Sequence, residues 1–67
     1  MKEENFILLR DANRVKAELH AGFISYDDAL NSVELKDYEN MFNREAKIIA
    51  KKWHKTFYPF NKSKFLR

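Results

Sequence analysis

The stretch that decides the fold is residues 20–28, which read HAGFISYDD. It holds the only glycine of the chain, Gly22, and three residues later Ser25. Glycine readily takes the left-handed conformation that ends a helix, and a serine N-cap accepts a hydrogen bond from an amide about three residues on, here that of Asp28. The stretch therefore predicts that one helix ends and another begins across a loop short enough to make the two helices antiparallel.

The segment before this turn has the spacing of an amphipathic helix. Its apolar residues recur at intervals of four, three and four, at Leu8, Ala12, Val15 and Leu19. Charged residues fall between them on the opposite side, as expected for a helix that packs one face on a core. We predict a helix over about residues 3–20.

A single helix after Ser25 would present apolar residues on two opposite sides. At about 100° per residue, one set falls within an arc of about 80°; this set is Leu35, Tyr38, Phe42, Ala46, Ile49 and Trp53. The apolar residues of 26–33 would face the other way, and Asn31 and Ser32, both favoured at N-caps, separate the two sets. We predict a short helix at 26–31 and a long one at about 34–56, with Trp53 in the core.

The C-terminal residues 56–67 contain the only proline, Pro59, and four aromatic residues. Proline disfavours helical backbone at the residue before it, and disordered segments are poor in aromatic residues. We therefore predict an extended, non-helical segment that folds back on the helices, with Phe60 and Phe65 sealing the hairpin. The predicted fold is all-α: one small domain over residues 1–67, built on an antiparallel helical hairpin.

Charge is distributed unevenly along the chain. All ten acidic residues lie at or before Glu45, whereas residues 46–67 carry seven lysines and arginines and no acid. Such asymmetry indicates an anionic partner for the basic end, either a nucleic acid or a membrane surface. The alternative is internal, with the basic segment folding onto the acidic half of the same chain.

The residues needed for catalysis or for holding a cofactor are scarce. One glycine cannot make a glycine-rich phosphate loop, and His20 and His54 have no acid or second histidine three or four positions away. The adjacent acids Asp27 and Asp28 suit the positive end of a helix dipole. We expect a non-enzymatic protein with no cofactor, no metal site and no small-molecule substrate.

The expected location is the cytoplasm. The chain has no cysteine, its N-terminus lacks the charged-then-apolar order of a signal peptide, and no apolar run approaches the roughly 20 residues of a membrane span. We therefore expect no transmembrane segment.

Two functional hypotheses follow. The first is non-specific nucleic-acid binding by the basic C-terminal region; its candidate contacts are Lys51, Lys52, Lys55, Lys62, Lys64 and Arg67. The second is a protein–protein adaptor or a small structural subunit of a larger assembly, with self-association as one form of it. Its candidate docking residues are Met41, Ile48, Phe60 and Phe65.

Overall fold

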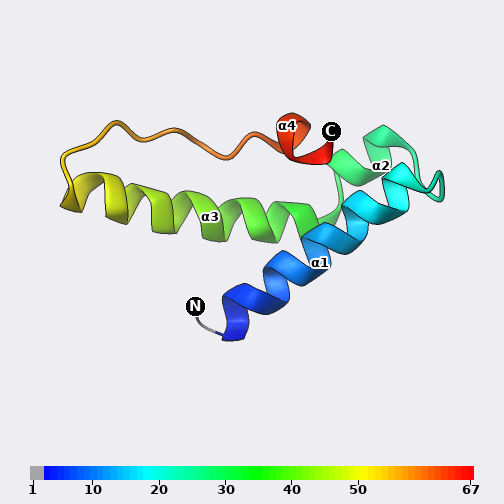
Figure 1. Ribbon diagram of the computed structural model, residues 1–67, viewed down its shortest axis with the longest axis horizontal. Helices are drawn as coiled ribbons and strands as arrows, with labels where there is room; N and C mark the ends of the chain where they lie inside the picture. The colour runs from blue at the N-terminus through cyan, green and yellow to red at the C-terminus, as the bar shows by residue number, and fades with distance from the viewer. Residues whose placement is uncertain (1–2) are drawn as a thin grey trace.

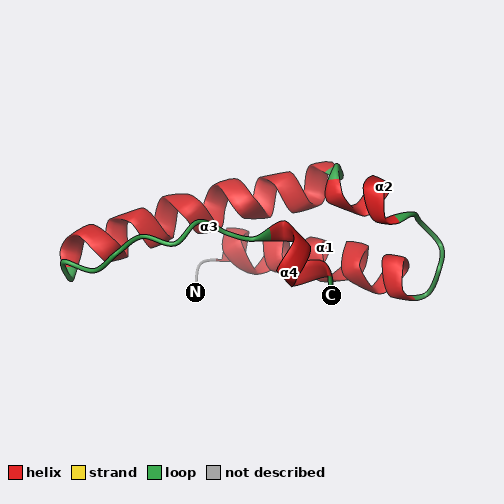
Figure 2. Cartoon of the chain, turned by 90° about the horizontal axis from the view of Figure 1, so that it is seen from above, coloured by secondary structure: helices red, strands yellow, loops and turns green. Residues whose placement is uncertain are grey.

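The computed structural model describes residues 3–67, which form four helices. These are α1 (Glu3–His20), α2 (Tyr26–Leu30), α3 (Val33–Lys52) and α4 (Lys62–Leu66). The predicted all-α class is confirmed, and α1 packs against α3 as a hairpin (Figure 1). Along the long axis of the molecule, the C-terminal part of α3 extends beyond the start of α1 in both views (Figures 1 and 2).

The turn between α1 and α2 has the predicted geometry. Gly22 has a φ of +82°. The amide of Phe23 donates to the carbonyl of Glu18 at 2.9 Å and that of Gly22 to Leu19 at 3.1 Å, the hydrogen bonds of a Schellman motif. The Ser25 hydroxyl then accepts from the Asp28 amide at 3.1 Å and caps α2.

The predicted break between α2 and α3 is confirmed. Asn31 is the C-cap of α2, and Ser32 is the N-cap of α3, its hydroxyl accepting from the Leu35 amide at 3.3 Å. Each helix boundary at this break therefore lies one residue from its predicted position. The Ser32 hydroxyl also donates to the Ala29 carbonyl at 2.8 Å, which joins the two helices at the bend.

The long helix ends at Lys52, four residues earlier than predicted. The helix ends early because the chain must return to the level of Asn43, whose side chain accepts a hydrogen bond from the Phe60 amide. A helix continued to residue 56 would lie about 20 Å beyond Asn43, and the four residues 57–60 span at most roughly 14 Å. The chain reverses sooner, in a Schellman turn in which the Lys55 amide donates to Ala50 at 2.8 Å and His54 has a φ of +54°.

The C-terminal segment was predicted to be extended and non-helical throughout, and this prediction is wrong for its last part. Residues 62–66 form α4, whose N-cap Asn61 accepts from the Lys64 amide through its side chain at 3.0 Å. The helical turn directs Leu66 into the core, where it is 2% exposed. The Leu66 carbonyl lies 2.7 Å from Nε2 of His20, which ties the C-terminal helix to the end of α1.

A small core holds these elements together. Its buried members come from every helix, and they are Ala12, Val15, Ala29, Leu35 and Leu66. Tyr38, Phe60 and Phe65 pack against it with ring centroids 5.3 to 5.8 Å apart and near-perpendicular or steeply tilted planes. The predicted folding back of Phe60 and Phe65 is confirmed. The prediction that Trp53 lies in the core is wrong. The residue lies beyond the part of α3 that packs against α1, and its side chain is 61% exposed.

Candidate binding groove

The segment that returns from the end of α3 to α4 is fixed at its two ends. We call residues 53–61 the return segment. At one end is the Schellman turn at His54, and at the other the Phe60 amide donates to Oδ1 of Asn43 at 2.7 Å. Figure 2 shows the segment running beside α3 between these points.

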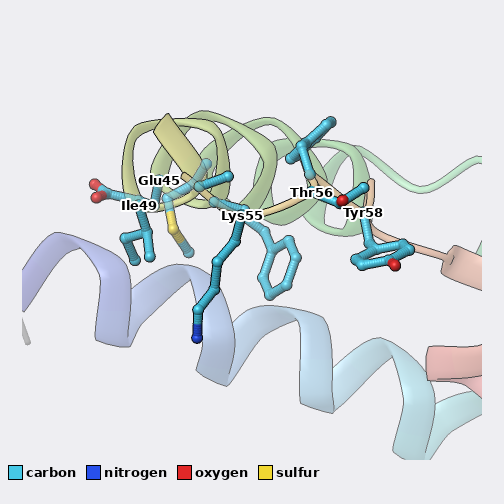
Figure 3. Close-up of a pocket in the computed structure, with 10 residues that line it drawn as sticks. Glu45, Ile49, Lys55, Thr56 and Tyr58 are labelled. Atoms are coloured by element: carbon cyan, nitrogen blue, oxygen red, sulfur yellow. The ribbon is translucent and has the colours of Figure 1, made fainter. Parts of the chain in front are cut away.

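A groove of about 360 Å³ opens between the C-terminal half of α3 and the return segment (Figure 3). We call it the apolar groove. On the α3 side it is lined by Met41, Phe42, Ala46, Ile49 and Ala50. On the other side it is lined by Thr56, Phe57 and Tyr58. The start of α1 lies beside the beginning of the groove, where Asn5 and Leu9 are near Met41 and Phe42. Further along, α3 extends past α1, and its apolar face there has the return segment beside it.

Two ionisable side chains, Glu45 and Lys55, complete the lining. In Figure 3 the Lys55 ammonium group extends away from the α3 ribbon, and the Glu45 carboxylate lies at the left edge of the group of lining side chains. The interior surface is therefore supplied by hydrocarbon groups. An arrangement of this kind binds by burying apolar surface, at roughly 25 cal/mol per Å².

Four lysines lie at the end of the molecule that carries the groove, and Lys55 lines it. The Lys47 ammonium lies 5.6 Å from the ring centroid of Phe57, and that of Lys52 lies 5.7 Å from the ring of Trp53. Lys51 and Lys55 are exposed at the same end of the molecule. None of these four lysines forms an ion pair with the side chains of residues 5–67. With Glu45 as the one carboxylate of the groove lining, they leave this end with a net positive charge.

The six residues predicted to contact nucleic acid do not form one cluster. Lys51, Lys52 and Lys55 lie at the end of α3, whereas the other three belong to α4 and its C-cap, which pack on α1 and α2. The α4 group, Lys62, Lys64 and Arg67, lies against the acidic half of the chain. Lys62 pairs with Glu39 at 3.7 Å, so part of the basic charge is neutralised internally.

The four residues predicted to dock a partner also separate. Met41 is 8% exposed and lies at the base of the groove, while Phe60 and Phe65 belong to the aromatic packing on the core. Ile48 is 59% exposed but faces the side of α3 away from the groove, where polar residues surround it. Of the four, only Met41 lines the apolar groove.

Sequence reasoning missed Ile49 as a surface residue, because helical spacing grouped it with Trp53 on the face predicted to pack on the core. Ile49 is 54% exposed. The spacing correctly grouped these residues on one face of α3, but it could not say how far α1 extends along that face. The two helices have similar lengths, 18 and 20 residues, and overlap only in part because α2 lies between them and α3 is shifted along the long axis. No local pattern in the sequence gives this shift.

No group of three metal-ligating side chains occurs within the described part of the chain. None of its helices combines the length and apolar character that crossing a membrane requires. Comparison with protein-family models, with curated proteins and with solved structures finds no match to this chain.

Proposed function

We propose that this chain is a non-enzymatic accessory protein that binds a polypeptide partner, as an adaptor or as a small structural subunit. The observation that carries the proposal is the apolar groove, a hollow of about 360 Å³ whose inner surface comes from Ile49, Phe57 and their apolar neighbours. An exposed apolar surface with polar groups at its edge is typical of a protein-interaction site. Apolar side chains of a partner that enter the groove would be buried against these residues, which no other part of residues 5–67 covers.

The neighbouring isoleucines Ile48 and Ile49 provide a matched pair of variants to test the proposal. They are exposed to similar degrees, 59% and 54%, but only Ile49 lines the groove. We expect Ile49→Asp to abolish capture of a stoichiometric protein from a nuclease-treated lysate of the source organism, and Ile48→Asp to leave it intact. Equal capture by both variants, or capture that nuclease removes, would contradict the proposal.

A second candidate function is non-specific binding of single-stranded nucleic acid at the end of α3. The observation that favours it is the 61% exposure of Trp53 beside Lys52, with Lys51 and Lys55 nearby. Exposed aromatic rings among lysines are typical of surfaces on which unpaired bases stack, each stacked base contributing about 1–3 kcal/mol.

A titration with an oligothymidylate at two salt concentrations tests this second candidate. Binding should quench the Trp53 fluorescence, weaken as salt rises and decrease in a Lys52→Ala variant, because phosphate contacts release counterions. Absence of binding at low salt would rule it out. A neutral groove variant, Ile49→Ser, should leave this binding unchanged because it adds no negative charge beside Lys52, and it therefore separates the two functions.

A further inference from the structure

The end of the molecule opposite the groove is acidic and also exposes apolar side chains. Phe23, in the turn after α1, is 79% exposed, and Tyr26, at the start of α2, is 45% exposed. Asp27 and Asp28 follow directly, both exposed, and residues 21–35 contain no lysine or arginine. We call Phe23, Tyr26, Asp27 and Asp28 the acidic tip.

The acidic tip and the apolar groove are complementary in chemistry. The tip offers two exposed aromatic side chains beside two carboxylates, and the groove offers an apolar hollow lined by Lys55 and Glu45. Lys47, Lys51 and Lys52 lie at the same end, and none of the four lysines has an ion-pair partner among residues 5–67, so lysines outnumber the single carboxylate there. They lie at opposite ends of a molecule that is 41 Å long (Figure 1). They cannot meet within one chain.

We propose that the acidic tip of a second copy of this chain occupies the apolar groove. Two copies placed antiparallel bring each tip to the groove end of the other, so that both contacts form at once and the assembly closes as a symmetric dimer. The inference rests on the proposed function, because it names the polypeptide that the groove binds. Phe23 and Tyr26 supply the apolar side chains, and the two aspartates face the lysines.

The surface of the chain is large enough for such an interface. Its accessible area is 5301 Å². A compact monomer of 8.1 kDa is expected to expose roughly 4,500 Å². The excess, about 800 Å², matches the area that each partner contributes to a standard protein–protein interface. The radius of gyration of 13.0 Å likewise exceeds the value of about 11 Å for a compact chain of this length.

Sedimentation velocity of the full chain over a range of concentrations tests the proposal. We expect a reversible dimer that weakens as salt rises, since the charged groups at both ends are exposed. Ile49→Asp in the groove and Phe23→Asp in the tip should each weaken it about tenfold or more, because each puts a charge where an apolar side chain is buried. Ile48→Asp is the control and should dimerise like the parent chain. A chain that stays monomeric at every concentration would overturn the proposal.

Mixing the two variants identifies the contact itself. The Ile49→Asp chain retains its tip and the Phe23→Asp chain retains its groove, so a one-to-one mixture should form a heterodimer through one intact contact. In a homodimer of either variant, both contacts contain an altered residue. If the mixture associates no better than the separate variants, the tip does not bind the groove. Circular dichroism checks that each variant is folded, and Ile49→Ala and Phe23→Ala serve as milder replacements for any that is not.

The failure of this inference is distinguishable from failure of the proposed function. A monomeric chain that still captures a protein in an Ile49-dependent manner contradicts the dimer and supports the adaptor. A dimer that the Ile49→Asp change leaves intact contradicts the tip-in-groove contact.

Discussion

Two residues, Gly22 and His54, end the long helices in the same left-handed conformation. Their φ values are +82° and +54°. Glycine adopts this conformation without strain, whereas a residue with a β-carbon does so at a cost of about 1 kcal/mol or somewhat more. The chain therefore has one favourable helix end, at α1, and one strained helix end, at the position where α3 turns to form the groove.

Replacing His54 by glycine should stabilise the protein. Relief of the left-handed strain outweighs the added backbone entropy of the unfolded chain, and we expect His54→Gly to raise the free energy of unfolding by about 0.5–1 kcal/mol. Urea denaturation measures this. His54→Ala is the control, because alanine keeps the β-carbon and should give no such gain.

The converse change at Gly22 should destabilise the protein. A β-carbon built on Gly22 meets no atom within 4 Å, so the cost comes from backbone conformation alone. We expect Gly22→Ala to lower the free energy of unfolding by about 1–2 kcal/mol in the same denaturation experiment. An unchanged midpoint would show that the turn relaxes to another conformation.

At the scale of elements, the helices could be predicted from the sequence and the path between them only in part. Gly22, Ser25 and Ser32 act within one helical turn of themselves, so local chemistry was enough to locate the turn and the break. The return segment depends instead on a hydrogen bond between residues 17 positions apart, Asn43 and Phe60. No local pattern indicates that bond. The end of α3 was accordingly predicted four residues too late, and the prediction that residues 62–66 are non-helical is wrong.

The Asn43 side chain should be the main polar anchor of the return segment. Asn43→Ala removes the acceptor and leaves the half-buried Phe60 amide without its partner, which costs about 1–3 kcal/mol. Urea denaturation should show this loss, together with faster hydrogen exchange at the Phe60 amide. Asn43→Asp retains an acceptor oxygen and should behave like the parent chain; equal losses in both variants would contradict the anchoring role.

At the scale of the whole molecule, few side chains are fully buried. Among the described residues, the largest fully buried side chains are Leu35, which is 0% exposed, and Leu66, which is 2% exposed. The smaller side chains of Ala12, Val15 and Ala29 are also buried. The sequence predicted the contribution of Leu35 from its helical spacing, but not that of Leu66, since a five-residue helix carries too little periodicity to assign a face. The separation of acidic and basic residues is plain along the sequence. In space it is smaller, because α4 returns to the acidic half of the chain and Lys62 pairs with Glu39.

Leu66→Ala should therefore be severely destabilising. Truncating a buried leucine costs about 2–5 kcal/mol, which is comparable to the whole stability of a small domain. We expect the variant to lose its cooperative thermal transition or to melt far below the parent chain. Lys64→Ala, in the same helix but exposed, is the control and should change the melting temperature little.

The central claim is that the apolar groove of one chain is the surface that binds another polypeptide, the acidic tip of a second copy. The most direct measurement is a series of ¹⁵N–¹H spectra of the labelled chain at increasing concentration. We expect concentration-dependent shifts at residues 46–50 and 55–58 of the groove and at residues 23–28 of the tip, with little change at Arg44 on the opposite side of α3. Spectra that do not change with concentration, or shifts confined to surfaces other than the groove and the tip, would contradict it.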